Sequence, residues 1–299
     1  MPHTVGIRGG LSVDHLASAP YGARFNQLGG PGLYAALGAR LVDGADVRLH
    51  ADLPRDDVRF AQLFDRLRID TATCAHADSI PRVWILNSPD GRRIVSTSTT
   101  GTVELETATI ASETAAAIEV PDAFYDGLDG LLESSPERRP PTANATIVGI
   151  DPHQLRVLSA GLDHLRDVTP DGAVILPSRV QLTLIDEDAR AAARRIVATL
   201  GNPVVARLDS DGMYVVAADG QWIVRDENVD VCETTGAGDS SAAAIVAALT
   251  TGADLVTAAM FGASIARLAV ADWGHAALSA ADPLTRPFNG ITATKELHS

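Results

Sequence analysis

The sequence has little cysteine, few basic residues and no long apolar run. Two cysteines, Cys74 and Cys232, cannot build a disulfide framework and lack the spacing of a zinc site. Lysine and arginine number 24 against 38 acidic residues, which gives a formal net charge of −14 at pH 7. The basic residues gather only in pairs such as Arg92–Arg93. Because phosphate backbones are held by concentrated positive charge, we expect no nucleic-acid partner.

Membrane and export signals are also lacking. No apolar run approaches the roughly 20 residues that a membrane helix needs. The first residues do not show a basic segment followed by an apolar one, as an export signal would. The eight histidines have no metal-ligand spacing. We therefore expect a cytoplasmic protein without a membrane partner.

The residues that are abundant favour a globular α/β chain. Hydrophobic residues make up 46% and charged residues 21%, a composition that excludes extended disorder. From residue 146 onward, short apolar runs alternate with helical segments. The expected strands cover 147–150, 173–176 and 203–206, and two alanine-rich helices follow at about 237–249 and 253–271. This alternation predicts one domain over residues 1–299, with a mostly parallel sheet covered on both faces.

The N-terminal third combines a strand, a helix and a hairpin. A strand interrupted by Gly9–Gly10 is expected over 5–13 and ends at Asp14, and a helix over 31–42 follows a diglycine. Residues 81–99 predict a β-hairpin with Pro-Asp-Gly in its turn, which suggests a small second sheet. Ligands of open α/β folds bind where strands end, so Asp14 is either a substrate-binding residue or an ordinary turn residue.

The segment that carries the chemistry is Glu-Thr-Thr-Gly-Ala-Gly-Asp at 233–239, directly before an alanine-rich helix. Gly236 and Gly238 allow a ligand to approach the backbone, and the first-turn N–H groups attract anions. A carboxylate at this place, Asp239, makes sense if it takes a proton from an alcohol that attacks a phosphate. Alternatively, Thr235 is a helix cap and Asp239 only complements the helix dipole. The segment is neither a P-loop nor a dinucleotide-binding fingerprint.

Residues 233–239 resemble the C-terminal signature of the ribokinase/PfkB family, which usually reads Asp-Thr-Thr-Gly-Ala-Gly-Asp. Six of the seven positions match, with Glu233 in place of the first Asp. The resemblance extends over most of the chain. It includes a first strand at 10–14, an N-terminal diglycine signature at 28–41, the hairpin in the place of the β-lid, and a strand end at 150–152.

This resemblance implies a ribokinase-like three-layer sandwich with a mostly parallel central sheet and a small β-lid. The lid insertion is expected mainly at about 81–99, with strands near 8–28 as a further candidate part. In the family pattern Asp239 would be the catalytic base, and the amides of Gly236, Ala237 and Gly238 would form the anion hole. The substrate-binding candidates are Asp14, Gly29, Gly30, Tyr34 and Arg82.

The resemblance also implies a nucleotide site and its cofactors. The nucleotide-binding candidates are Ser178, Arg207, Asp209, Gly212, Thr234 and Thr235. Glu233 is the metal candidate, directly or through water. The expected cofactors are ATP and Mg²⁺, with a monovalent cation as a further candidate. The expected partners are a small-molecule alcohol, a nucleotide and a second copy of the chain that pairs through its lid.

Several positions depart from the family pattern. Tyr34 stands where most members have Asn. Ser178 and Gln181 replace both anchors of an Asn-x-x-Glu pattern tied to Mg²⁺. Asp209 stands beside the nucleotide in place of a glycine, with Arg179 and Arg207 as candidates to compensate its charge.

The leading hypothesis is therefore an ATP-dependent kinase that acts on an alcohol group of a sugar, sugar derivative, cyclitol or nucleoside. One alternative is a catalytically weak or inactive binding or regulatory protein on a kinase fold, motivated by Ser178, Gln181 and Asp209. Another is a nucleoside-type kinase in which Tyr34 stacks on the base.

Overall fold

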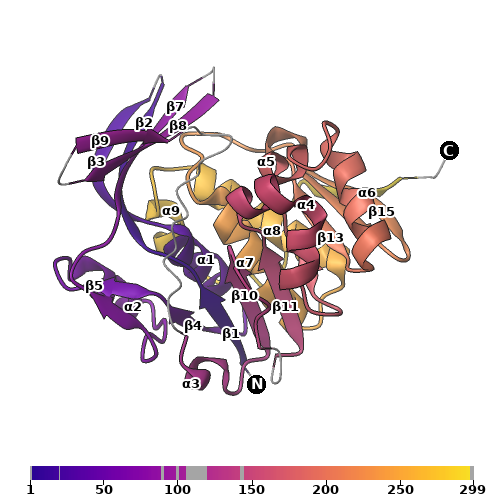
Figure 1. Ribbon diagram of the computed structural model, residues 1–299, viewed down its shortest axis with the longest axis horizontal. Helices are drawn as coiled ribbons and strands as arrows, with labels where there is room; N and C mark the ends of the chain where they lie inside the picture. Colours follow the sequence, from indigo (N-terminus) through magenta and orange to yellow (C-terminus); the bar gives the residue numbers. More distant parts are fainter. Residues whose placement is uncertain are drawn as a thin grey trace.

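The computed structural model describes residues 2–19, 21–88, 91–98, 101–105, 120–141 and 145–296. Part of the expected hairpin turn, at residues 89 and 90, lies outside the described residues. Within them the chain forms a large sheet, a second sheet of five strands and a small two-stranded sheet, with helices packed on the large sheet (Figure 1). The small sheet pairs β5 (Asp52–Pro54) with β6 (Ala75–Ala77).

The large sheet is parallel over most of its width. In spatial order its strands are β16 (Ile291–Lys295), β15 (Gly220–Asp226), β14 (Met213–Ala217), β13 (Val204–Arg207), β12 (Val174–Ile175), β11 (Ile147–Asp151), β10 (Gly130–Ser134), β1 (His3–Arg8) and β4 (Ala45–His50). The pairings from β4 to β13 are parallel, and those from β13 to β16 are antiparallel. The carboxyl ends of the parallel strands therefore meet at one edge, where open α/β folds bind ligands.

Helices cover both faces of this sheet. One face carries α1 (Pro31–Arg40), α7 (Ala237–Thr250), α8 (Leu255–Val270) and α9 (Ala276–Ala280), and the other carries α4 (Gln154–Val168), α5 (Arg179–Thr183) and α6 (Ala189–Leu200). Strand residues alternate between the two cores: Val205 and Val215 pack in the first, Val204 and Val216 in the second. This is the predicted three-layer α/β sandwich.

The remaining helical segments lie outside these layers or at their margins. They are α2 (Arg59–Arg66), α3 (Asp122–Tyr125) and a 3₁₀ turn, η1 (Asp209–Asp211). No helix in the described part of the chain is long and apolar enough to cross a membrane.

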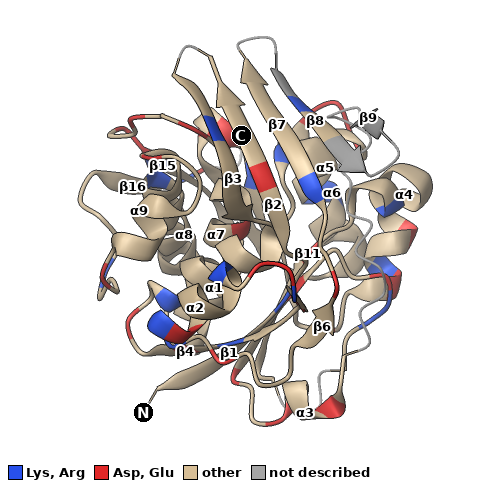
Figure 2. Cartoon of the chain, turned by 90° about the vertical axis from the view of Figure 1, so that its left-hand side faces the viewer, with Lys and Arg blue, Asp and Glu red and all other residues tan. Residues whose placement is uncertain are grey.

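The second sheet, called the lid sheet below, combines two distant segments of the chain. Its strands in order are β3 (Gly22–Gly29), β2 (Ser12–Ser18), β7 (Arg82–Ser88), β8 (Gly91–Ser98) and β9 (Gly101–Leu105). Figure 2 shows β2, β3 and β7 standing above the body, with basic residues dispersed among acidic ones over this side. Leu16, Val83 and Ile85 form an apolar cluster with Trp273 of the body. One face of the lid sheet is thus anchored on the body.

The strand predicted over residues 5–13 is wrong as a single element. It is split into β1 of the large sheet and β2 of the lid sheet. The split occurs at Gly9–Gly10, where the chain crosses between sheets against the start of α1. A Cβ atom on Gly9 would lie 2.8 Å from the Gly32 nitrogen, so only glycine fits there. Asp14 consequently lies inside β2 of the lid sheet and does not end a strand of the large sheet.

Candidate active site

The signature segment forms the start of α7. Gly236 is its N-cap residue with φ = 78°, in the left-handed region that favours glycine, and no side chain caps the helix. In contrast, α5, α6 and α8 begin with side-chain caps from Ser178, Asp188 and Asp254. The first N–H groups of a helix have no intrahelical acceptor and lie at the positive end of its dipole. The start of α7 is therefore suited to an anion.

Helix α1 begins next to α7. The ring of Tyr34, in the first turn of α1, packs on Gly236, where a Cβ atom would lie 2.1 Å from the ring. One turn later Gly38 lies against Ser240, where a Cβ atom would be 2.1 Å from the backbone oxygen. The two helices therefore run in the same direction with their first turns in contact. The N-cap residue of α1, Gly30, also provides no side-chain cap.

Asp14 is held at this same place. Its carboxylate is 1% exposed and accepts a hydrogen bond of 2.6 Å from the Ser12 hydroxyl. A Cβ atom on Gly29 would lie 1.9 Å from Asp14 Oδ2, so the carboxylate occupies the space that a side chain at Gly29 would need. The structure therefore gathers the candidates Asp14, Gly29 and Gly30 beside Tyr34 at the start of α1. Through Tyr34 they adjoin the signature segment.

Glu233 connects the signature segment to the lid sheet. This side chain is 1% exposed, and its Oε1 accepts hydrogen bonds from the Thr235 N–H at 2.8 Å and the Thr235 hydroxyl at 2.6 Å. The same oxygen accepts a bond of 2.7 Å from Asn87 Nδ2 on β7. The sequence reasoning did not identify Asn87. The alternation of side chains along a strand could have indicated this residue, because Asn87 follows Val83 and Ile85 on the side of β7 that faces the body.

A cation fits Glu233 chemically. Its second oxygen, Oε2, is buried and has no hydrogen-bond partner among the described residues. The described residues contain no cluster of three acidic, histidine or cysteine side chains suited to a metal ion. Mg²⁺ commonly binds through one or two carboxylates, with phosphate and water as its other ligands. Glu233 is thus the residue that could hold such an ion.

The expected nucleotide-binding arginine, Arg207, is buried next to the start of α7. It ends β13 and is 7% exposed. Its Nη2 lies 2.8 Å from Asp151 Oδ1 and donates to the Leu176 carbonyl oxygen at 2.6 Å. Its Nη1 lies 3.0 Å from the position that a Cβ atom on Gly238 would take. Arg207 therefore faces the first turn of α7.

The two altered anchors, Ser178 and Gln181, are hydrogen-bonded to each other. They form a capping box at the start of α5, in which the Gln181 side chain accepts from the Ser178 N–H at 2.6 Å. Gln181 Nε2 also donates to Asp151 Oδ1 at 3.3 Å and to the Pro152 carbonyl oxygen at 2.6 Å. Ser178 forms a backbone bridge with Arg207, which faces the start of α7. Ser178 and Gln181 therefore lie near the start of α7, although their side chains are already engaged in the hydrogen bonds of the capping box.

Asp209 and Gly212 lie on the exposed turn after β13. Asp209 has a positive φ of 51°, and Gly212 has φ = 82°. Of the two arginines expected to compensate Asp209, it is Arg179 that does so, through Nε at 3.0 Å. Arg179 Nη2 also pairs with Asp211 at 2.6 Å. Burial alone would lower the pKa of the Arg179 guanidinium, but the contacts with Asp211 and Asp209 outweigh it, so this pKa is raised.

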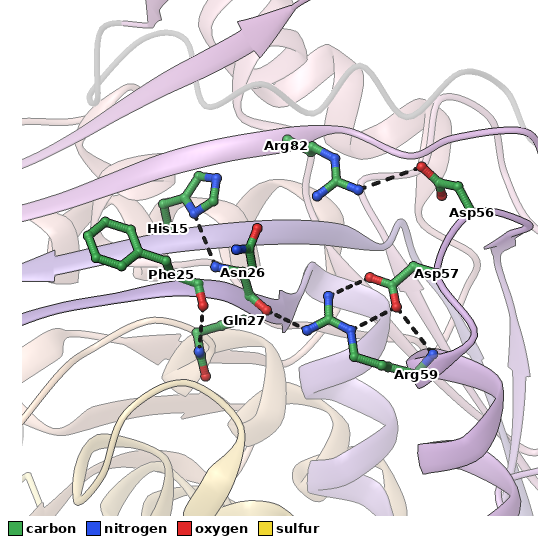
Figure 3. A network of polar contacts seen from close by, with 8 residues as sticks. All are labelled: His15, Phe25, Asn26, Gln27, Asp56, Asp57, Arg59 and Arg82. Atoms are coloured by element: carbon green, nitrogen blue, oxygen red, sulfur yellow. Dashed lines mark hydrogen bonds and ion pairs between the residues drawn. The ribbon is translucent and has the colours of Figure 1, made fainter.

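Arg82 lies at the base of the lid sheet, in the polar network of Figure 3. Its guanidinium pairs with Asp56 at 3.6 Å, and both side chains are exposed. In the same network Asp57 bonds Arg59, which lowers the pKa of the Asp57 carboxyl. His15 Nδ1 accepts from a backbone N–H, and burial followed by the charge of Arg82 lowers the pKa of His15. No described contact joins Arg82 to the signature segment.

Similarities to a protein family, to a curated relative and to two solved structures accompany this geometry. Residues 178–280 match the family model of the pfkB family carbohydrate kinases. A stretch of 121 residues, 37% of this chain, is 36% identical to the bifunctional protein HldE of Rhodospirillum rubrum and spans 24% of that relative. The structure superposes on aminoimidazole riboside kinase from Salmonella enterica with a TM-score of 0.67 and 18% identity, covering 92% of this chain and 96% of that one.

A ribokinase from Thermotoga maritima gives a TM-score of 0.66 at 18% identity, over 95% of this chain and 97% of that one. Similarity at this identity concerns the fold, and the curated relative is matched over about a quarter of its length. The signature segment and both altered anchors fall inside the matched residues 178–280. The resemblance to the ribokinase/PfkB family is confirmed: residues 178–280 are similar to the pfkB family carbohydrate kinases, and the fold is ribokinase-like.

Proposed function

We propose that the protein is an ATP-dependent phosphotransferase that acts on an alcohol group of a sugar, sugar derivative, cyclitol or nucleoside. The observation that carries this proposal is the start of α7, where a glycine N-cap leaves the first amides without a side-chain cap and Asp239 stands in the first turn. A carboxylate beside a phosphate is favourable when it receives the proton of the attacking hydroxyl.

In the proposed reaction the acceptor hydroxyl transfers its proton to Asp239 while its oxygen forms a bond to the terminal phosphorus of ATP. The bond from that phosphorus to the bridging oxygen breaks, and ADP leaves. The amides of Gly236, Ala237 and Gly238 are proposed to stabilise the charge on the transferred group. Asp14, next to the start of α1, is proposed to orient the acceptor.

The other candidate residues are assigned to the substrate, the nucleotide and a cation. We assign substrate contacts to Gly29, Gly30, Tyr34 and Arg82, and nucleotide contacts to Ser178, Arg207, Asp209, Gly212, Thr234 and Thr235. Glu233 would hold Mg²⁺ or a monovalent cation, which would neutralise phosphate charge when bound. Its buried free oxygen supports this assignment.

The test is ADP release with a panel of sugars, cyclitols and nucleosides. We expect turnover with at least one acceptor, and a loss of about 10²- to 10⁴-fold in kcat for Asp239→Asn, because a general base contributes about that much. Asp163→Asn is the matched control, since Asp163 is an exposed carboxylate on α4 paired with Arg166. Normal turnover of Asp239→Asn would show that the proposed base is wrong.

One observation supports a second candidate, a binding or regulatory protein with weak or no turnover. The side chains of Ser178 and Gln181 bond each other and Asp151, so they have fewer free groups for a ligand. Calorimetry separates the candidates, because the second one predicts nucleotide binding without ADP release for every acceptor in the panel.

A nucleoside acceptor is a further alternative within the kinase proposal. Tyr34 is 1% exposed and packs on Gly236, so stacking on a base would require its ring to leave this position. Comparison of the wild-type and Tyr34→Asn proteins on nucleosides and hexoses tests this role. A loss confined to nucleosides would support stacking.

We also propose a homodimer through the outer face of the lid sheet. Trp84 lies on the face opposite Val83 and Ile85, with His15 at 4.7 Å and Phe25 at 5.7 Å between ring centroids. Phe25 is 56% exposed, which is unusual for an aromatic side chain in such a cluster. Light scattering after size exclusion should give a dimer for the wild type and a monomer for Phe25→Glu.

A further inference from the structure

The lid sheet contains a β-bulge next to Asp14. Asp14 of β2 pairs with Gln27 of β3, and beyond this pair the register shifts by one residue. Phe25 and Asn26 of β3 therefore both lie opposite the single residue His15 of β2. Asn26 has φ = 52°, in the left-handed region that asparagine adopts more readily than most other residues. Bulges of this kind often re-aim a side chain beside a functional site.

The bulge determines which residue of β3 lies against the Asp14 carboxylate. Because side chains alternate along a strand, a shift of register by one residue exchanges the two faces. With the bulge, Gly29 shares the face of Gln27, and Asp14 Oδ2 lies 1.9 Å from the position that a Cβ atom on Gly29 would take. Without it, Asn26 would pair with Asp14, and Leu28 would replace Gly29 on that face. The space that holds the carboxylate therefore depends on the bulge.

Two side chains from other elements hold the backbone of Asn26 (Figure 3). His15 Nδ1 accepts from the Asn26 N–H at 3.1 Å, and Arg59 Nη1 donates to the Asn26 carbonyl oxygen at 2.7 Å. Arg59, the first residue of α2, is itself fixed by Asp57, which accepts from its Nε at 2.8 Å. The imidazole of His15 packs on Trp84, with 4.7 Å between ring centroids. Both backbone groups of Asn26 are thus satisfied by side chains whose own positions are supported.

We infer that His15 and Arg59 are positioning residues for Asp14. They hold the backbone of Asn26, and the bulge fixes the Asp14 carboxylate where it orients the acceptor alcohol. The inference rests on the proposed function for the role of Asp14. Neither side chain needs to contact the acceptor, since each acts through the backbone of β3.

The contact from His15 also makes acceptor binding depend on pH. Nδ1 accepts only in the neutral imidazole, because both nitrogens of the protonated ring donate. Burial, followed by the charge of Arg82, lowers the pKa of His15, so the contact is present at neutral pH and is lost as the pH falls through that pKa. The other rings that face His15, those of Trp84 and Phe25, are uncharged.

The test separates the two properties of the imidazole. His15→Phe keeps an aromatic ring without the acceptor, whereas His15→Asn keeps an acceptor oxygen in the place of Nδ1 without the ring. Steady-state kinetics use the acceptor that gives ADP release in the panel. We expect His15→Phe to raise the KM for the acceptor by about 3- to 10-fold, the effect of one hydrogen bond, and the KM for ATP by less than about twofold. Arg59→Met should show the same selective rise, and His15→Asn should stay near the wild type.

The matched controls are His76→Phe and Arg66→Met, which change an exposed histidine on β6 and an exposed arginine in the last turn of α2. Both should leave the two KM values unchanged. The wild-type KM for the acceptor should also rise between pH 7 and about pH 5, below the usual pKa of histidine, and the His15→Asn protein should lack this rise.

Three results would overturn the inference: an unchanged acceptor KM in His15→Phe, an equal rise in the KM for ATP, or equal losses in His15→Phe and His15→Asn. If His15→Phe does not fold, Arg59→Met carries the same comparison. Absence of turnover with every acceptor would refute the proposed function, and hydrogen exchange then decides the inference. The amides of β3 should exchange at least about fivefold faster in His15→Phe than in the wild type, and equal rates would overturn it.

Discussion

The hydrogen bond between Asn87 and Glu233 is expected to couple the lid sheet energetically to the signature segment. The perturbation is a double-mutant cycle of Asn87→Ala, Glu233→Ala and both together. Glu233 Oε1 accepts from Asn87 at 2.7 Å and twice from Thr235, and the carboxylate is 1% exposed. Removal of Glu233 therefore leaves three donors without their acceptor, and removal of Asn87 leaves two bonds in place.

The magnitude follows from the charge and burial of this acceptor. A hydrogen bond to a charged group contributes about 1.5–3 kcal/mol, so Asn87→Ala alone should lower the free energy of unfolding by about that amount. Glu233→Ala should cost about 3–5 kcal/mol, because the Thr235 donors are buried. In the Glu233→Ala background, Asn87→Ala should change the free energy of unfolding little, because the hydrogen bond between the two residues is already lost. The expected coupling energy is about 1.5–3 kcal/mol, well above the roughly 0–1 kcal/mol of exposed pairs.

The measurement is urea unfolding of the four proteins at pH 7 with linear extrapolation. A second cycle between Asn87 and Asp57 is the control, since these residues share no described partner and their effects should add within about 0.5 kcal/mol. A coupling energy between Asn87 and Glu233 below about 0.5 kcal/mol would refute the reasoning. The Asn87 bond would then contribute little to the coupling between the lid sheet and the signature segment.

Three further predictions concern glycine positions and pH. Gly29→Ala should destabilise the fold by at least about 1–3 kcal/mol, because its Cβ atom would overlap Asp14, and an unchanged thermal midpoint would contradict this. Gly236→Ala should cost about 1–2 kcal/mol for the left-handed backbone plus the overlap with the neighbouring ring, which urea unfolding measures. The Asp57 pKa is lower in the folded state, so its contribution to stability is present above about pH 4 and is lost as the pH falls. The Asp57→Asn protein should therefore lose less stability between pH 5 and pH 3 than the wild type, and identical pH profiles would exclude this contribution.

Regular periodicity in the C-terminal half predicted most of its elements. The strands at 147–151 and 204–207 and the helices α7 and α8 agree with the expected ranges to within a few residues. Strand β10 was missed because its five residues contain only Leu131 and Leu132 as large apolar side chains. Its position depends on parallel pairing with β1 and β11, which a local pattern does not report.

The part of the site that lies in one sequence segment was predictable, and the part formed by contacts between distant segments was not. The glycine cap and Asp239 lie three positions apart in one segment, so the segment alone indicated an anion site. Asp14 was expected at the end of the strand over 5–13 and lies inside β2 instead, because the crossing at Gly9–Gly10 depends on the close approach of α1. The contact between Asn87 and Glu233 joins residues 146 positions apart, and no sequence spacing encodes it.

The parallel pairing of β2 with β7 has a kinetic consequence. Val13 pairs with Arg82, so the lid sheet closes a loop of about 70 residues, at an entropic cost of roughly 4 kcal/mol. That loop contains α1 and β4, and their docking on the large sheet brings the two strands together. The lid sheet should therefore form late during folding, and its amides should exchange with solvent before those of the central strands.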